Sequence, residues 1–320
     1  MPKSKPSPSK NAQNRAQSAR SAKSRPTAAP PKPTVRGWIG AARLRTLPLA
    51  VAPVALGTGA ATLQGQVEPL LAWLCLAVAV LLQIGVNFAN DYSDGVRGTD
   101  DVRVGPARLT ASRAVKAKTV LIVALSFFGL AAVAGLAIVV ITGIYWLLIV
   151  GAAAIVAAWF YTGGKHPYGY AGLGEIFVFI FFGLVATVGT MYVLVSTVSL
   201  EALLCGAAIG FIACAVLMAN NIRDIAQDKL VGKKTLAVKV GDRAARILYV
   251  VFMAVPYIVL GLLTLLYPIA PLVFFTLLIA VPAALIVLTG KTAREFILAL
   301  QLTSMVGLLY GLGVAAALAF

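Results

Sequence analysis

Long apolar segments dominate this chain of 320 residues and limit its possible folds more than any other feature. Hydrophobic residues make up 60% of the sequence, charged residues make up 12%, and the mean hydropathy is +0.91. These values exclude an ordinary water-soluble domain and indicate an all-α polytopic membrane protein. A helix needs about 20 apolar residues to cross a bilayer. By that measure we predict nine transmembrane helices, at residues 47–64, 69–90, 120–141, 144–161, 173–195, 202–221, 247–267, 269–289 and 296–319.

The basic residues predict how these helices are oriented. All 27 Lys and Arg residues lie either in the N-terminal segment up to Arg45 or in the connections that follow the second, fourth, sixth and eighth predicted helices. The connections on the other side carry only Glu68 and Glu201 as charged residues. Because basic residues accumulate on the cytoplasmic face of membrane proteins, we expect the N-terminus in the cytoplasm and the C-terminus on the opposite face of the cell (plasma) membrane.

Residues 1–35 have a different composition, rich in Lys, Arg, Ser, Pro, Ala and Gln with few apolar residues. Such a segment cannot bury enough apolar surface to fold, so we expect a disordered basic cytoplasmic tail before a transmembrane domain at residues 36–320. The tail could contact the anionic headgroups of the lipid bilayer. The net charge of +16 does not indicate nucleic-acid binding, because the basic residues follow one face of the membrane.

Two acidic clusters interrupt the apolar pattern, and together they hold four of the eleven acidic residues. They lie at the ends of the second and sixth predicted helices, which suggests two related four-helix halves plus one further helix. Carboxylates at a bilayer boundary are energetically costly unless another group compensates their charge, so their presence here needs an explanation. The clusters are Asn87-Phe-Ala-Asn90-Asp91-Tyr-Ser-Asp94 and Asn220-Asn221-Ile-Arg223-Asp224-Ile-Ala-Gln-Asp228.

The spacing within each cluster predicts a face of oxygen ligands. Asn87, Asp91 and Asp94 are separated by four and three residues, and Asp224 and Asp228 by four, so each set is expected on one side of a helix. Oxygen ligands without His or Cys favour Mg²⁺ over zinc or copper, and Mg²⁺ would hold a polyanion such as diphosphate. The alternative is that these aspartates cap helices or pair with nearby basic residues in a solvated loop.

Three basic residues and one further acidic residue complete the candidate site. Arg108 and the pair Lys233 and Lys234 follow the two clusters and could bind diphosphate oxygens, although each lysine also fits a purely topological role. Glu175 begins a very apolar segment, where it could hold or deprotonate a hydroxyl group of an acceptor. Its alternative role is an interfacial residue near a helix N-terminus, where the helix dipole favours it.

The clusters resemble the two motifs of a known family, the UbiA superfamily of intramembrane prenyltransferases. Asn90-Asp91-Tyr-Ser-Asp94, with Asp100 and Asp101 further on, resembles the first, NDxxD-type motif, and Arg223-Asp224-Ile-Ala-Gln-Asp228 resembles the second, DxxxD. The resemblance covers residues 36–320 and implies a UbiA-like bundle. Within the superfamily the chain most resembles the branch that acts on 1,4-dihydroxy-2-naphthoate. The segments that carry this resemblance are 42–48, 83–92, 105–108 and 162–175.

The resemblance implies an Mg²⁺-dependent transfer of a polyprenyl group from polyprenyl diphosphate to a dihydroxynaphthoate-type aromatic acceptor. Carbon dioxide and diphosphate would be lost, and demethylmenaquinone would form. Metal ligands would be Asp91, Asp94, Asp224, Asp228 and Asn87, and catalytic residues would be the same four aspartates and Glu175. Substrate-binding residues would be Asn87, Asn90, Arg45, Arg108, Lys165, Asn221, Arg223, Lys233 and Lys234.

Three alternatives remain at this point. Another UbiA branch would use hydroxybenzoate or a different acceptor in the same fold. A CDP-alcohol phosphotransferase is less well matched, because its aspartates form one compact block whereas these clusters are more than a hundred residues apart. A cation-coupled transporter with paired broken helices would place its acidic residues near the bilayer midplane, whereas these lie at one face.

Overall fold

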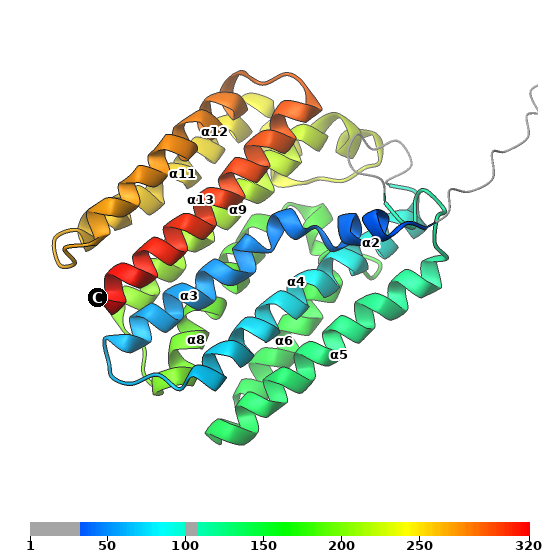
Figure 1. Cartoon of the computed structure of the whole chain (residues 1–320). Coiled ribbons are helices and arrows are strands. Elements are labelled where there is room, and N and C mark those ends of the chain that lie inside the picture. The colour runs from blue at the N-terminus through cyan, green and yellow to red at the C-terminus, as the bar shows by residue number, and fades with distance from the viewer. Residues whose placement is uncertain (1–32, 100–107) are drawn as a thin grey trace, which may run out of the picture.

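The computed structural model describes residues 33–99 and 108–320, and all regular elements within these ranges are helices (Figure 1). Residues 1–32 of the expected tail, together with Asp100 and Asp101, lie outside the described residues. The α-helices are α2 (Val35–Ala42), α3 (Pro48–Thr62), α4 (Pro69–Arg97), α5 (Ala117–Thr142), α6 (Leu147–Phe160), α7 (Gly174–Val178), α8 (Ala186–Val195), α9 (Leu200–Leu230), α10 (Leu236–Val240), α11 (Asp242–Leu263), α12 (Leu277–Thr289) and α13 (Ala293–Ala319). Three further elements are 3-10 helices: η1 (Leu44–Thr46), η2 (Tyr168–Ala171) and η4 (Ala270–Thr276). The element η3 (Phe179–Val185) is a π-helix.

The structure has the helices of a polytopic membrane protein, although fewer than nine reach spanning length. Seven described helices are long and apolar enough to cross a membrane, and the pair Val35–Thr46 and Pro48–Thr62, bent by 42°, makes a possible eighth. The fourth predicted segment, 144–161, forms only the 14-residue helix α6. A helix of that length spans about 21 Å, which is shorter than the roughly 30 Å of hydrocarbon in a bilayer.

Helix α9 lies at the centre of the bundle and packs against α3, α11, α13 and η3. Small residues permit this close packing. A Cβ atom on Gly183 of η3 would lie 2.5 Å from the carbonyl oxygen of Gly206 and 2.6 Å from Cα of Gly210, both on α9. The last helix, α13, packs against α3 from the first half of the chain and against α9 and α12 from the second, so it joins the two parts.

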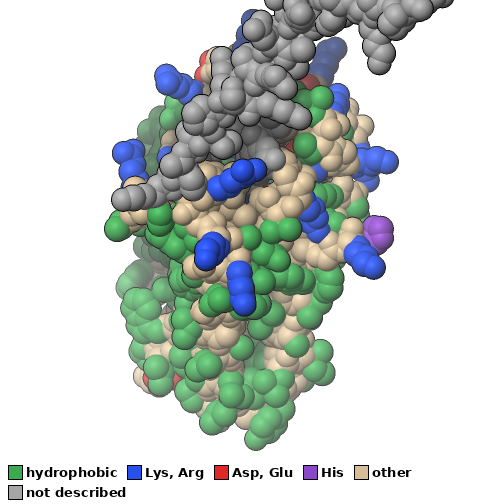
Figure 2. Space-filling view, turned by 90° about the vertical axis from the view of Figure 1, so that its right-hand side faces the viewer, with side chains coloured by type: hydrophobic (Ala, Val, Ile, Leu, Met, Phe, Trp, Pro, Cys, Tyr) green, Lys and Arg blue, Asp and Glu red, His purple; other side chains and the backbone are tan. Residues whose placement is uncertain are grey.

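The surface separates into an apolar region and a basic end. Large apolar side chains such as Leu125, Val133 and Val140 of α5 are exposed, as expected for contact with lipid tails. Figure 2 shows Lys and Arg side chains gathered towards one end of the molecule, above a face that is mostly hydrophobic. The acidic clusters end α4 and α9 among the basic connections, which fits a polar site at one boundary of the membrane.

Candidate active site

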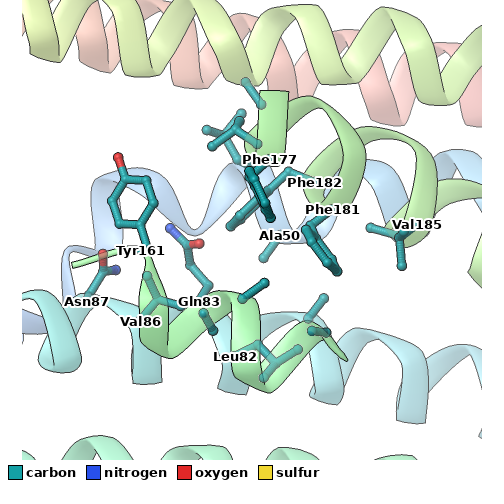
Figure 3. Close-up of a pocket in the computed structure, with 18 of the residues that line it drawn as sticks. Ala50, Leu82, Gln83, Val86, Asn87, Tyr161, Phe177, Phe181, Phe182 and Val185 are labelled. Carbon is teal, nitrogen blue, oxygen red and sulfur yellow. The ribbon is translucent and has the colours of Figure 1, made fainter. Parts of the chain in front are cut away.

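A cavity of about 600 Å³ runs between the helices from the ends of α4 and α9 into the apolar part of the bundle. Its polar end is formed by residues of both acidic clusters and of the connections that follow them. Its deeper walls are apolar. Figure 3 shows Phe177, Phe181, Phe182 and Val185 opposite Leu82 of α4. The cavity therefore has a charged end and a long hydrophobic end.

Eight of the predicted site residues line this cavity. Helix geometry explains the selection on α4, because residues seven apart return to nearly the same side of a helix. Asn87 and Asp94 have this spacing, and Asn90 lies beside them. The lining residues among the predictions are Asn87, Asn90, Asp94, Arg108, Asn221, Asp224, Asp228 and Lys233.

Asp91 differs from the expectation, because it does not line the cavity with Asn87 and Asp94. Its side chain is fully buried, and its two carboxylate oxygens accept hydrogen bonds from the backbone N–H groups of Leu109 (3.0 Å) and Thr110 (2.9 Å). These residues directly follow Arg108. Asp91 thus attaches the connection that carries Arg108 to the side of α4, and both of its oxygens already have backbone donors.

Asp94 connects the two halves of the chain at the polar end. Lys233, from the connection after α9, lies 3.3 Å from Asp94 Oδ1, and Arg108 lies 3.9 Å from Oδ2. The Tyr170 hydroxyl donates a hydrogen bond to Oδ1. Burial and the nearby Asp94 carboxylate raise the pKa of Tyr170, so its hydroxyl keeps the proton that it donates. The Tyr170 ring also lies beneath the Lys233 ammonium, 4.4 Å from the ring centroid.

The second cluster is held by its own basic and hydroxyl residues. Arg223 binds both carboxylate oxygens of Asp224, at 2.7 and 2.6 Å, and also donates to Asn220. Asp228 Oδ2 accepts a hydrogen bond from Thr235 at 3.4 Å. Arg223 is therefore a partner of Asp224 and does not itself line the cavity.

Glu175 lies behind the cavity wall and not within it. Its Oε1 accepts a hydrogen bond from the Asn221 side-chain amide at 3.0 Å, and the Cys214 thiol donates to its backbone carbonyl. Asn221 lines the cavity and Glu175 does not, so the hydrogen bond to Asn221 links Glu175 to the cavity.

Three predicted substrate-binding residues lie at exposed positions away from the cavity lining: Arg45, Lys165 and Lys234. Adjacent residues on a turn point in different directions, and here Lys233 faces the cavity while Lys234 faces outward. Near the N-terminus the lining residue is Arg43, whose left-handed backbone (φ 52°) ends α2, and not Arg45.

Several lining residues were not among the predicted site residues. Thr162 donates a hydrogen bond to Asn90 at 2.6 Å, and Arg97 donates to the Thr162 carbonyl. Tyr161, Tyr170 and Gln83 also face the cavity. Gln83, Thr162 and Tyr170 lie in segments that carry the family resemblance. Tyr161 is recognisable only when distant segments are brought together.

The described residues do not contain a complete metal cage. Across residues 33–99 and 108–320, no three His, Cys, Asp or Glu side chains are grouped closely enough to hold a metal ion. However, Asp94, Asp224 and Asp228 face one cavity and supply the hard oxygen donors that Mg²⁺ prefers. Because Mg²⁺ commonly combines one or two carboxylates with substrate phosphates and water, these donors fit a metal that binds together with a phosphorylated ligand.

Fold and cavity together define the class of protein. It is an integral membrane protein of packed helices, with a cavity whose cationic and carboxylate end suits an anionic headgroup and whose apolar end suits a hydrophobic chain.

Comparisons with known proteins agree with this class. The model of the UbiA prenyltransferase family matches residues 50–303. The chain is 47% identical over 295 residues to 1,4-dihydroxy-2-naphthoate octaprenyltransferase of Mycobacterium tuberculosis, covering 88% of this chain and 97% of that protein. The protein of the same name from Mycobacterium leprae is 43% identical over 285 residues, with coverages of 88% and 95%.

A solved structure supports the fold. A UbiA homolog from Archaeoglobus fulgidus bound to DMAPP and Mg²⁺ superimposes with a TM-score of 0.60 at 17% identity, covering 88% of this chain and 99% of that one. The chain therefore belongs to the UbiA prenyltransferase family. This membership argues against the transporter and CDP-alcohol phosphotransferase alternatives.

Proposed function

We propose that this protein transfers a polyprenyl group from polyprenyl diphosphate to 1,4-dihydroxy-2-naphthoate, with release of carbon dioxide and diphosphate, to give demethylmenaquinone. The observation that carries the proposal is a single cavity with a charged end and a long apolar end, which matches a diphosphate attached to an isoprenoid. The names of the relatives at 47% and 43% identity support naphthoate as the acceptor.

The charged end would hold the diphosphate. Arg108 and Lys233 provide cationic donors there, and Arg43 lines the same cavity. Mg²⁺ would be held by Asp94, Asp224 and Asp228 with neutral oxygens such as that of Asn87, and when bound it would stabilise the negative charge of the departing diphosphate. Asp91 is left out of this set because it is fully buried away from the cavity lining, with both oxygens accepting backbone hydrogen bonds.

The apolar walls would protect the reaction from water. When the bond between the isoprenoid C1 and the diphosphate breaks, the allylic carbon becomes cationic, and water would capture it. Phe177, Phe181 and Phe182 line the cavity beyond the charged end and exclude solvent there. The electron-rich ring of the acceptor then forms the new carbon–carbon bond to C1, and the ring carbon concerned loses its carboxylate as carbon dioxide.

Glu175 would act through Asn221. The Asn221 amide nitrogen donates to Glu175, and Asn221 lines the cavity. The carbonyl oxygen of Asn221 would then be the group that binds a substrate hydroxyl or a metal. We place the site at the cytoplasmic face of the plasma membrane, because the cavity's charged end lies among the basic connections.

Product formation in membranes tests the proposal. Membranes that contain the protein are supplied with a polyprenyl diphosphate, Mg²⁺ and either 1,4-dihydroxy-2-naphthoate or 4-hydroxybenzoate, and the products are separated and identified by mass. We expect a prenylated naphthoquinol that disappears with EDTA and returns when Mg²⁺ is added. If a product forms only with 4-hydroxybenzoate, the protein is still a prenyltransferase, but the proposed acceptor is wrong.

A further inference from the structure

Gln83 lies on α4 one turn before Asn87, where the polar end of the cavity meets its apolar part (Figure 3). The side chain is only 7% exposed, and its carboxamide projects into the cavity. A buried carboxamide among apolar residues is unfavourable unless its nitrogen and oxygen both form hydrogen bonds. The partners of these two atoms therefore indicate whether Gln83 has a ligand.

A short chain of hydrogen bonds determines which way the carboxamide points. The Thr46 hydroxyl donates its proton to the Arg43 carbonyl at 3.0 Å, so its oxygen is available only as an acceptor. Gln83 Nε2 donates to that oxygen at 2.9 Å. The nitrogen is thus directed to Thr46, and the carbonyl oxygen Oε1 is directed away from it.

Gln83 Oε1 is buried and has no hydrogen-bond partner among the described residues. It is therefore an acceptor placed in a cavity wall that needs a donor from a ligand. The isoprenoid chain carries no O–H or N–H group, and a diphosphate offers only acceptor oxygens. Asp94, which lies beside the cationic groups of Arg108 and Lys233, is eleven residues further along α4, at about 16 Å along the helix.

We propose that Gln83 Oε1 accepts a hydrogen bond from a ring hydroxyl of the aromatic acceptor, and so sets the orientation of the ring at the boundary between the two parts of the cavity. This inference rests on the proposed function, since it requires a hydroxylated aromatic substrate. A ring hydroxyl is the donor that the two substrates can offer. The hydrogen bond also draws the hydroxyl proton away from the ring, which favours attack on the allylic carbon.

The test compares how tightly two monohydroxy analogues bind. 1-Hydroxy-2-naphthoate and 4-hydroxy-2-naphthoate each lack one ring hydroxyl and are measured as competitive inhibitors against 1,4-dihydroxy-2-naphthoate. In the wild-type protein we expect the analogue without the recognised hydroxyl to bind about tenfold more weakly than the other, the usual effect of one hydrogen bond. In Gln83→Met, which keeps the side-chain length, the two analogues should bind with equal inhibition constants.

The same variant should raise KM for the naphthoate about tenfold while KM for the polyprenyl diphosphate stays unchanged. Thr46→Val frees the carboxamide to rotate and should reduce the discrimination between the analogues. Val86→Ala, at a cavity-lining apolar residue of the same helix, is the control and should retain the wild-type discrimination between the two analogues.

Equal binding of both analogues to the wild-type protein would overturn the inference without any variant. Unchanged discrimination in Gln83→Met would overturn it as well. Either result leaves the proposed function intact as long as the wild-type protein prenylates the naphthoate. If the wild-type protein prenylates only a different arene, the proposed acceptor is wrong, and the same comparison is made with the hydroxyl analogues of that arene.

Discussion

Asp91 and Asp94 are three residues apart on α4, yet their carboxylates have different surroundings. Asp91 accepts two backbone hydrogen bonds from the Leu109–Thr110 connection, whereas Asp94 faces the cavity beside Lys233, Arg108 and Tyr170. A carboxylate that satisfies buried N–H groups contributes to folding. One that faces a cavity among cations is available to a ligand.

Substitutions should separate these two roles. Asp94→Asn removes a charged oxygen from the cavity, so we expect turnover to fall at least about 100-fold with little change in melting temperature, in line with the loss of one group that stabilises developing charge. Asp91→Ala leaves two buried N–H groups without acceptors and should reduce the stability by roughly 2–4 kcal/mol. Thermal unfolding in detergent and prenyl transfer measure both effects; equal melting temperatures for the two variants would contradict this division.

Glu175→Gln offers a second test at a single residue. The glutamine Oε1 can still accept the hydrogen bond from Asn221, so the geometry remains while the negative charge is lost. If that charge acts by holding Asn221 in the orientation that binds the acceptor hydroxyl, turnover should fall about tenfold, the usual effect of one weakened hydrogen bond. Binding of the polyprenyl diphosphate, measured by competition with an unreactive analogue, should not change. Wild-type turnover in this variant would remove the catalytic role.

At the scale of elements, the cavity wall depends on an irregular helix. The segment from Gly174 to Val195 changes from α-helix to π-helix at Phe179–Val185 and back again. A π-helical turn holds one more residue than an α-helical turn, so it changes the direction in which the side chains project, and such turns are frequent at functional sites. Here Phe181, Phe182 and Val185 of the π-helix line the cavity.

Gly183 lets this irregular helix lie close to α9. Gly183→Ala places a Cβ atom 2.5 Å from the Gly206 carbonyl oxygen, so one backbone has to move, and we expect a loss of roughly 1–3 kcal/mol in stability together with lower turnover. Gly129→Ala on α5 is the matched control. Its Cβ meets no atom within 4 Å, and helix propensity predicts a gain of about 0.5–1 kcal/mol. Thermal unfolding of both variants in detergent measures the difference.

At the scale of the whole molecule, the cavity is assembled from helices of both parts of the chain. α4 contributes one acidic cluster and α9 the other, while Lys233 reaches across to Asp94. The last helix, α13, holds the parts together by packing against α3, α9 and α12. The charged ends therefore meet on the side of the bundle where the basic connections lie.

Orientation in the membrane is testable at this scale. Single cysteines at exposed Lys165 and Lys234 should react with a membrane-impermeant thiol reagent only after the cells are opened, because both lie on the basic side, which we propose to be cytoplasmic. A cysteine at Glu68, which is exposed just before α4 on the opposite side, should react in intact cells. The natural cysteines Cys75, Cys205 and Cys214 are buried and should react slowly in both cases. Labelling of Lys234→Cys in intact cells would contradict the proposed topology and indicate the opposite orientation.

The sequence predicted most of the helices, because apolar runs and the distribution of basic residues depend only on the order of residues. It also predicted that both acidic clusters continue the helices beyond the apolar spans. The predicted segments stop at residues 90 and 221, whereas α4 continues to Arg97 and α9 to Leu230. The polar residues that follow the apolar spans stay helical, because their charges are compensated by the backbone N–H of Leu109, by Lys233 and by the neighbouring Arg223.

The sequence by itself determined that this is a helical membrane protein with two acidic clusters near one boundary, since hydropathy, charge and motif spacing are properties of the linear chain. The tertiary structure decided which of these residues act together. It turned Asp91 towards the backbone and Asp94 towards the cavity, and it selected Arg43 and Lys233 over Arg45 and Lys234. It also left Gln83 Oε1 without a hydrogen-bond partner in the part of the chain that the structure describes. The physical reason is that burial and hydrogen-bond partners depend on segments distant in the chain, which only the packed bundle brings together.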